Sequence, residues 1–367
     1  MKKENKVGIL TMYRSGNYGA TLQAYATKQA ICENGFAEAE IIPYCADSVK
    51  QKIDRKFIKK AGLFRTAVAC VEKIYYYPRM KKMNAFVDSF APSHQLKKED
   101  LPALSDRYDV FLSGSDQIWN PDIQQGDYSY LLDFVTDPHK KRSYGSSFGV
   151  AQLDTEYVER YRELLSQYHR ITVREIGGAA LVEQLLGKPA ELVIDPTLLL
   201  TPAQWEAKLP KRAYQGNYVF AYQMAHSPLI ANVVKRAKKA LGAKAVFVPF
   251  PIMGACKCRP VMNLSSLEWL RSIYDSRFVV TDSFHGAVFS IIFRKQFYYV
   301  ITSDTVRKRL SRLETLLGSL GIEDRFVDDV SQCDFEKVID YDAVHARLDE
   351  QRVHSLKILK ELVSDED

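Results

Sequence analysis

Short hydrophobic runs alternate with longer helical stretches along most of the chain. Runs of strand length occur at residues 7–11, 40–44, 108–113, 141–149, 169–175, 192–194, 218–222, 245–249, 278–280 and 296–301. Continuous apolar runs of this length are typical of strands that are buried on both faces of a parallel sheet. Strands that alternate with helices predict an α/β fold, here two doubly wound Rossmann-like domains that face a cleft.

The pattern also predicts where the domains divide. Asp195-Pro196 ends a short run, and we place the domain junction near it. We expect an N-terminal domain at residues 1–190, with a basic helical insertion at about 48–100, and a C-terminal domain at 191–340. The last helix, within residues 341–367, is expected to pack back on the N-terminal domain.

The segment at residues 278–291 has the pattern of a strand, a tight turn and a helix. The apolar run ends in Thr281, Asp282 and Ser283, which are good helix-capping residues, and His285-Gly286 opens an apolar helix. A helix N-terminus at the carboxyl end of a parallel strand is where α/β sheets bind anions. His285 could hydrogen-bond a phosphate or a leaving oxygen there, or could simply fill the turn.

The first strand leads into a glycine-containing loop with Gly16, Asn17, Tyr18 and Gly19. Glycine allows a tight turn and a close approach of the backbone to a ligand. The spacing is G-x-x-G and not the G-x-G-x-x-G of a dinucleotide-binding loop, so we do not expect NAD.

Two further strands end in polar loops. The strand at 108–113 is followed by Gly114, Ser115, Asp116 and Trp119, where Trp119 either stacks on a sugar or belongs to the core. Arg174 lies at the end of the strand predicted at 169–175. It either clamps a carboxylate or phosphate with its planar fork, or forms an ion pair with Glu175 or a neighbouring acid.

Composition narrows the class of protein. The chain has 367 residues, 46% hydrophobic and 26% charged, and a net charge of +6 from 51 basic and 45 acidic residues. A balance this mild favours anionic small substrates or an anionic surface without requiring either, and no nucleic-acid-binding module accompanies it. No hydrophobic run has the length of a signal peptide core or a membrane span, so we expect a cytoplasmic protein.

Two local features leave alternatives open. The basic segment at residues 50–82 contains Tyr75, Tyr76 and Tyr77. It is typical of a solvated helical hairpin, but also of a segment that lies on the inner face of a membrane or contacts an anionic glycan. Cys256 and Cys258 form a C-x-C pair without a second ligand cluster, which is a weak signal for a metal, and we expect none.

Several segments, taken together and in this order, resemble the polysaccharide pyruvyl transferase family. They are GNYGATLQAYA, GSDQIWNP, YGSSFG, VREIGGAALVEQL, DPTLLL, VVTDSFHGAVFSIIF and SRLETLLGSLGIEDR, between residues 16 and 325. The resemblance implies a GT-B-like fold. It also implies a transferase that moves the enolpyruvyl unit of phosphoenolpyruvate onto a sugar, forming a pyruvate ketal. The sugar would belong to a cell-surface polysaccharide such as a capsule or exopolysaccharide, or to its lipid-linked precursor.

The resemblance also implies roles for individual residues. His285 would act on the phosphate, as an electrostatic stabiliser or as general acid, and Asp116 would be the base. The implied donor-binding residues are Arg174, Asp282, Ser283, Gly286 and Arg312. The implied acceptor-binding residues are Asn17, Tyr18, Gly19, Ser115 and Trp119. The chemistry would need no metal or nucleotide cofactor.

The chain departs from the family at one position. Members commonly have Arg-x-His-Gly where this chain has Ser283-Phe284-His285-Gly286. Losing an arginine removes a charge and several donors from a site for a dianion. Either another cation replaces it, with Arg294, Arg307, Arg309 and Arg312 as candidates, or the donor differs. A nucleotide-linked donor in a GT-B-like transferase, or a non-catalytic glycan-binding component, are the alternatives.

Overall fold

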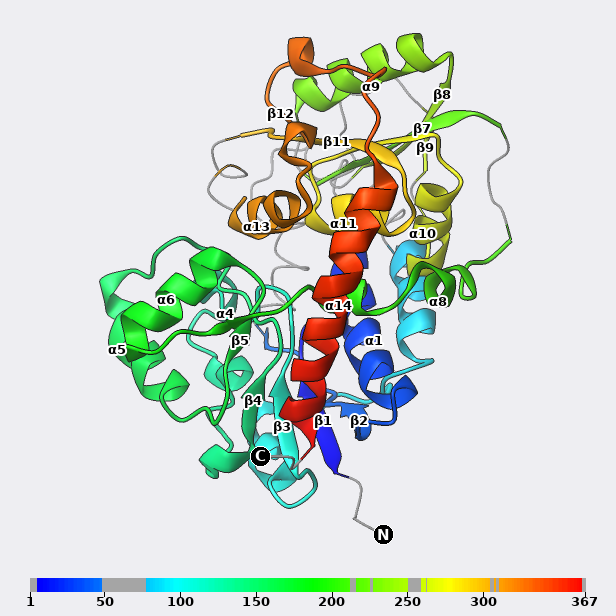
Figure 1. Cartoon of the computed structure of the whole chain (residues 1–367). Helices are drawn as coiled ribbons and strands as arrows, with labels where there is room; N and C mark the ends of the chain where they lie inside the picture. Colours follow the sequence, from blue (N-terminus) through cyan, green and yellow to red (C-terminus); the bar gives the residue numbers. More distant parts are fainter. Residues whose placement is uncertain are drawn as a thin grey trace, which may run out of the picture. The chain divides into compact units, whose positions relative to one another are not determined.

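A computed structural model describes most of the chain, and its residues form two compact units (Figure 1). The described residues are 5–47, 77–211, 216–224, 227–249, 259–261, 263–303, 307 and 310–364. Of these, the first unit contains 5–47, 87–200 and 349–364. The second unit contains 77–86 and the described part of 201–348.

The sheet of the first unit is parallel, with the strand order β2-β1-β3-β4. Bridges from Arg142 to Arg170 and from Ser146 to Val173 continue it from β4 to the parallel pair β5–β6. The strands are β1 Lys6–Leu10, β2 Glu38–Ile41, β3 Val110–Ser113, β4 Lys141–Ser143, β5 Thr172–Val173 and β6 Glu191–Leu192. β3 is buried at every position, as its continuous apolar run predicts.

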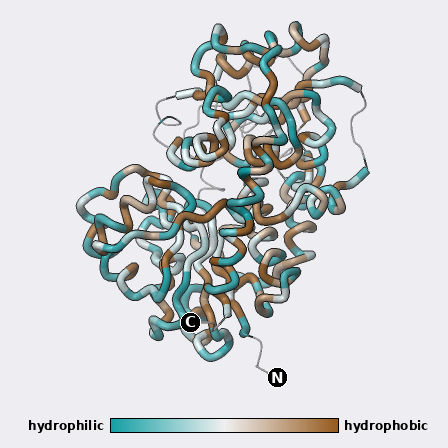
Figure 2. Tube along the Cα trace, in the orientation of Figure 1, coloured by the Kyte–Doolittle hydropathy of each residue, from teal (hydrophilic) through white to brown (hydrophobic). Residues whose placement is uncertain are grey.

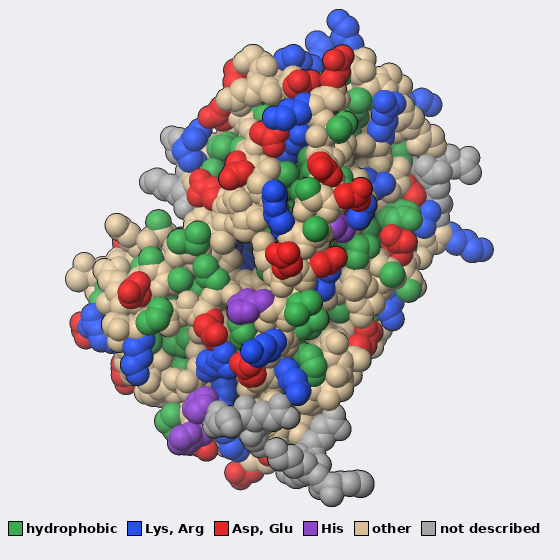
Figure 3. Space-filling view, in the orientation of Figure 1, with side chains coloured by type: hydrophobic (Ala, Val, Ile, Leu, Met, Phe, Trp, Pro, Cys, Tyr) green, Lys and Arg blue, Asp and Glu red, His purple; other side chains and the backbone are tan. Residues whose placement is uncertain are grey.

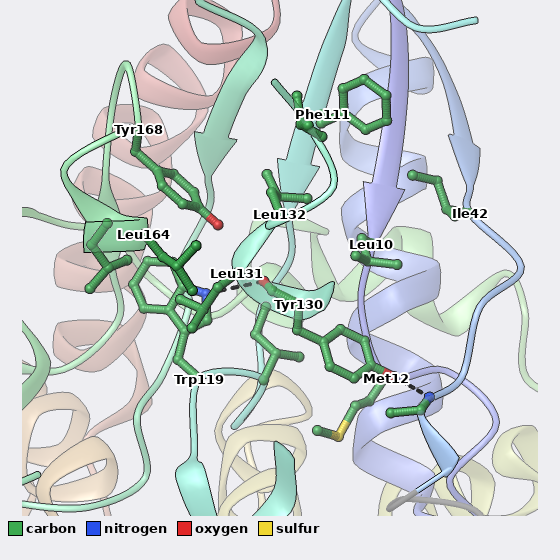
Figure 4. Close-up of a cluster of buried hydrophobic side chains, with 14 of the residues drawn as sticks. Leu10, Met12, Ile42, Phe111, Trp119, Tyr130, Leu131, Leu132, Leu164 and Tyr168 are labelled. Carbon is green, nitrogen blue, oxygen red and sulfur yellow. Dashed lines mark hydrogen bonds between the residues drawn. The ribbon is translucent and has the colours of Figure 1, made fainter. Parts of the chain in front are cut away.

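Helices connect these strands. They are α1 Tyr18–Glu33, α4 Pro121–Gln124, α5 Thr155–Leu165, α6 Ile176–Leu186 and α7 Pro196–Leu199, with the 3-10 turns η1 Lys98–Leu104, η2 Tyr128–Leu131 and η3 Pro138–Lys140. The core of the unit is rich in aromatic side chains, and Figure 4 shows part of it, including Trp119 and Tyr130.

The sheet of the second unit is also parallel, with six strands in the order β12-β11-β10-β7-β8-β9. The strands are β7 Tyr218–Gln223, β8 Lys244–Pro249, β9 Arg259–Pro260, β10 Phe278–Thr281, β11 Gln296–Val300 and β12 Phe326–Val327. Its helices are α8 Pro202–Glu206, α9 Pro228–Leu241, α10 Ser266–Tyr274, α11 Phe284–Ile292 and α13 Ser311–Leu320, with η4 Glu323–Arg325 and η5 Val330–Gln332. Figure 2 shows hydrophobic and hydrophilic stretches alternating along the trace. Helix α11 is buried from His285 onward.

The boundary between the units falls at residues 200–201, ten residues later than the predicted 190–191. β6 pairs with β5, and α7 packs against α1, so residues 191–199 belong with the first sheet. The last helix, α14 Tyr341–Val363, contributes to both units. Its residues from 349 onward join the first unit, where Glu361 pairs with Arg170 at 2.9 Å.

The predicted basic insertion is only partly described. Residues 48–76 lie outside the described residues, and residues 77–86 belong to the second unit instead of the first. Lys82 there pairs with Glu268 at 3.1 Å. On the face drawn in Figure 3, basic and acidic side chains are interspersed.

Candidate functional site

The strand order gives each sheet one switch point, where successive strands begin to add on the opposite side. In the first sheet it lies between β1 and β3. In the second sheet it lies between β7 and β10. Ligands of doubly wound sheets bind beyond the carboxyl ends of the strands at such points. The loops after β1, β3 and β10 are three of those in which the sequence predicts site residues.

The loop after β1 turns directly into helix α1. Gly16 has φ +70°, and Asn17 caps the helix, its Oδ1 accepting from the N–H groups of Gly19 at 2.9 Å and Ala20 at 3.4 Å. Asn17 is partly exposed, but Tyr18 is fully buried. The predicted acceptor contact of Asn17 is compatible with this exposure, and that of Gly19, which is buried in α1, stays a prediction, whereas the Tyr18 side chain belongs to the core.

Asp116 lies in the loop after β3 and has an unusual backbone conformation. Its φ is +70°, and its carbonyl accepts hydrogen bonds from Ile118 at 2.8 Å and Ser147 at 3.1 Å. A left-handed conformation costs a residue with a side chain about 1 kcal/mol, least for Asn and Asp. Such strained positions are concentrated at functional sites, because the surrounding structure must hold them in place.

Arg174, after β5, is held by acidic groups of its own unit. One end of its guanidinium, Nη1, contacts Asp195 and also donates to Ser115 Oγ at 3.1 Å, and Nη2 donates to Asp116 Oδ1 at 3.1 Å. Glu175 Oε2 lies 3.9 Å from Nε. Burial alone would lower the pKa of Arg174, but these three carboxylates outweigh it and raise the pKa, so the side chain is a cation.

This geometry supports the ion-pair interpretation of Arg174. Its side chain is 1% exposed, and its donors face protein acids. Sequence reasoning identified Arg174, Ser115 and Asp116 separately, but took Asp195 only as the end of a strand. The signal for Asp195 was its place before Pro196, which is typical of a helix cap.

Trp119 lies in the core of the first unit, not on a surface where a sugar could stack. It is fully buried, and its indole N–H donates to Ser113 Oγ at 3.1 Å and to the Tyr130 carbonyl at 3.3 Å (Figure 4). Phe148 and Tyr168 meet it edge to face. The structure therefore corrects its predicted role in acceptor binding.

Replacing Trp119 with alanine is expected to destabilise the first unit by about 3–5 kcal/mol, the usual cost of deleting a buried aromatic side chain. Tyr77, which is 72% exposed, provides a matched control, since Tyr77→Ala should change stability by less than about 0.5 kcal/mol. Denaturant unfolding measures both. An unchanged midpoint for Trp119→Ala would contradict the core assignment.

In the second sheet, two side chains of the turn after β10, Asp282 and Ser283, accept hydrogen bonds from backbone N–H groups. Asp282 Oδ1 accepts from the Met224 N–H at 2.6 Å, which ties this turn to the end of β7 across the switch point. Ser283 caps α11, and its Oγ accepts from the Gly286 N–H at 3.3 Å. A Cβ on Gly286 would lie 2.5 Å from Thr281 Oγ1, so only glycine allows this close contact between helix and strand.

His285 and Arg312 each lie beside the ring of Phe284. The His285 ring lies 5.0 Å from the Phe284 ring, nearly perpendicular to it, and the Arg312 guanidinium lies 5.2 Å from the Phe284 centroid. Burial and Asp282 raise the pKa of Tyr299, and Arg312 opposes them. The charges of Asp282 and Arg312 therefore both act on this hydroxyl near the end of β11.

Two of the other candidate arginines pair with acids elsewhere. Arg294 is at the far end of α11 and pairs with Asp342 at 2.7 Å, and Arg307 pairs with Asp328 at 2.7 Å. Both are more than half exposed, and Arg309 lies outside the described residues. Arg312 is therefore the candidate that the structure brings to the His285 turn.

The described residues include no group of three or more His, Cys, Asp or Glu side chains arranged to hold a metal ion. None of the helices described is both long enough and apolar enough to cross a membrane. Cys256 and Cys258 lie outside the described residues.

Comparisons with known proteins agree with the sequence segments. A family model described as polysaccharide pyruvyl transferase matches residues 17–304. A comparison with curated proteins gives no match. UDP-N-acetylglucosamine 2-epimerase from Rickettsia bellii is 9% identical with a TM-score of 0.50, covering 98% of this chain and 96% of that chain. A glycosyltransferase from Rickettsia africae is 12% identical with a TM-score of 0.44, covering 100% of both chains.

At such identities the solved structures bear on the fold alone. The likeness to the epimerase over nearly the whole chain, together with the two parallel sheets, confirms the predicted GT-B-like α/β fold. The family model covers well over half of the chain and confirms the predicted family.

Proposed function

Because the chain belongs to the polysaccharide pyruvyl transferase family, we propose that it transfers the pyruvyl group of phosphoenolpyruvate to a pair of hydroxyls on a sugar. The product is a pyruvate ketal, and inorganic phosphate is released. The sugar belongs to a cell-surface polysaccharide or to its lipid-linked precursor. The basic segment at residues 50–82 lies mostly outside the described residues, and no part of the proposal depends on it.

The observation that carries the proposal is the turn after β10. It lies at the switch point of the second sheet and combines a helix N-terminus, the His285 imidazole and the nearby Arg312 guanidinium. Helix N–H groups and a cation are what a phosphate requires. Arg312 supplies the positive charge that the family commonly places two residues before the histidine, where this chain has Ser283.

The proposed reaction balances without a further reactant. One sugar hydroxyl attacks C2 of the enolpyruvyl group, while its proton passes to a base and an acid delivers a proton to the methylene carbon, which becomes a methyl group. The bond between C2 and the bridging oxygen of the phosphate then breaks, and phosphate leaves. The second hydroxyl attacks C2 and loses its proton. A diol and the phosphoenolpyruvate trianion thus give a ketal monoanion and hydrogen phosphate.

The residues fit this chemistry in two groups. In the second unit, His285 stabilises the phosphate or donates a proton to the departing oxygen, with Arg312, Ser283 and Gly286 beside it. In the first unit, Asp116 is the proposed base, and the loop of Asn17 and Gly19 and the Ser115-Asp116 loop are proposed to face the acceptor. No step uses a metal, so activity is expected to persist in EDTA.

Phosphate release from phosphoenolpyruvate tests the proposal directly. The purified full chain is incubated with phosphoenolpyruvate and a panel of p-nitrophenyl hexosides, and phosphate and the mass of each glycoside are followed. We expect phosphate release that depends on one glycoside, with a product heavier by the pyruvate ketal. Thermal stabilisation by nucleotide sugars alone would favour a nucleotide-linked donor, and indifference to all donors with glycan binding retained would favour a binding component.

Arg312→Gln is expected to weaken the binding of phosphoenolpyruvate about 10- to 100-fold, the usual effect of losing a hydrogen bond to a charged group. The midpoint of a thermal-shift titration with phosphoenolpyruvate measures this. Arg294→Gln is the matched control, because Arg294 is at the other end of α11 in an exposed pair with Asp342. Equal effects of the two substitutions would contradict the assignment of Arg312.

A further inference from the structure

We propose that Arg174 and Asp195 are positioning residues that hold Asp116 in place as the base, and that Arg174 makes no contact with the donor. This inference rests on the proposed function. It reverses the role in donor binding that the family resemblance implies for Arg174, and it assigns a role to Asp195 for the first time. The contacts that carry it all lie within the first unit.

Asp195 is the fixed end of the arrangement. Its Oδ1 accepts from the N–H of Thr197 at 3.0 Å and from Thr197 Oγ1 at 2.6 Å, so it caps α7. Its Oδ2 contacts Arg174 and lies 3.4 Å from Ser115 Oγ. The carboxylate is therefore held through both oxygens, and its side chain is only 1% exposed.

Arg174 connects the fixed carboxylate of Asp195 to Asp116. Nη1 is anchored by Asp195 and Ser115, and because a guanidinium is planar and rigid, Nη2 is then fixed as well. Nη2 donates to Asp116 Oδ1 at 3.1 Å. A lysine would keep the charge but could not reproduce this fork of two anchored donors.

Exposure identifies which of these residues meets a substrate. The side chains of Arg174 and Asp195 are each 1% exposed and that of Glu175 is 4%, whereas that of Asp116 is 14% exposed. Asp116 also has the positive φ, three residues after the end of β3. The strained and accessible member is therefore the one at which chemistry is expected.

The charges argue against a donor at Arg174. One guanidinium faces the three carboxylates of Asp116, Glu175 and Asp195, a formal charge of −2 if all are ionised. The guanidinium already pairs with protein acids, so a phosphate or carboxylate of phosphoenolpyruvate would have to displace these internal carboxylates to reach it.

Kinetics separate positioning from donor binding. With the glycoside that supports turnover, we expect Arg174→Lys and Asp195→Asn each to lower kcat at least about 30-fold. The KM for phosphoenolpyruvate should stay within about threefold, because the donor is held elsewhere. Arg170→Gln is the control, since Arg170 is also held by two acids of this unit, Glu191 and Glu361, but is 30% exposed and outside the site.

Two results would overturn the inference. A tenfold or larger rise in the KM for phosphoenolpyruvate with kcat retained in Arg174→Lys would show that Arg174 binds the donor. A kcat for Asp195→Asn equal to that of the parent would show that Asp195 positions nothing. Asp195→Asn keeps the shape of the side chain, so it provides a folded variant if Arg174→Lys does not fold.

A measurement without turnover keeps this inference separate from the proposed function. Carboxyl ¹³C signals of labelled aspartate are followed against pH, with Asp116 assigned from the spectrum of Asp116→Asn. Asp116 should ionise at higher pH in Arg174→Gln than in the parent, because its adjacent cation is lost while Asp195 and Glu175 remain. An unchanged midpoint would overturn the inference even if the chain proved inactive with phosphoenolpyruvate.

Discussion

Replacing His285 with glutamine is expected to lower kcat for phosphate release by about 10²- to 10⁴-fold, the usual contribution of a positioned acid or base. Glutamine can still hydrogen-bond a phosphate oxygen, but it cannot carry a proton to the departing oxygen or a positive charge. His285 is 5% exposed, in a turn that the Ser283 cap holds closed. Water therefore has little access to the position of the ring and cannot readily take over its role in the variant. The loss should therefore appear in kcat more than in the KM for phosphoenolpyruvate.

A second buried histidine of the same unit provides the control. His345 on α14 is 7% exposed, and its Nε2 lies 2.9 Å from the Ile291 carbonyl at the end of α11. His345→Gln should change the unfolding midpoint while leaving kcat within about threefold, because its partner is the backbone. A His285→Gln variant that folds and keeps the parent kcat would remove His285 from the chemistry.

Much of the fold could be predicted from local sequence, because parallel strands and their turns leave local signals. Apolar runs located the strands, and a run of capping residues located the helix start at Ser283, which caps α11 in the structure. Asn17 also caps a helix, but the sequence pattern there predicted only a glycine-containing loop. The boundary near residue 190 was too early, because the pairing of β6 with β5 is a contact between distant segments that no local pattern records.

The site was harder to predict for the same reason. Arg174 reaches Asp195 across 21 positions and Asp116 across 58, and no local pattern states which acid an arginine will meet. The sequence left Arg174 with two interpretations, and only the packing of β3, β5 and α7 in one unit decided between them. Trp119 was ambiguous because a tryptophan after a strand can face a ligand or the core, and burial alone distinguishes the two.

Asparagine in place of Asp116 is expected to lower kcat about 10²- to 10⁴-fold while leaving the fold intact. Asparagine accepts a positive φ as readily as aspartate, and its carbonyl oxygen can still accept from Arg174 Nη2. The substitution therefore removes the base without straining the loop. Asp116→Ala should lose the same activity and also about 1 kcal/mol of stability, since alanine tolerates the left-handed conformation less well.

Asp122→Asn controls for the loss of a carboxylate, because Asp122 is exposed six residues further along the same segment. It should leave kcat and the unfolding midpoint unchanged within error. Single-turnover measurements of phosphate release across pH would then show which group causes the fall in rate at low pH. If Asp116 is the base, this fall should disappear in Asp116→Asn. A profile that keeps this fall would place the base elsewhere, and the anchoring of Asp116 by Arg174 and Asp195 would then serve the stability of the loop alone.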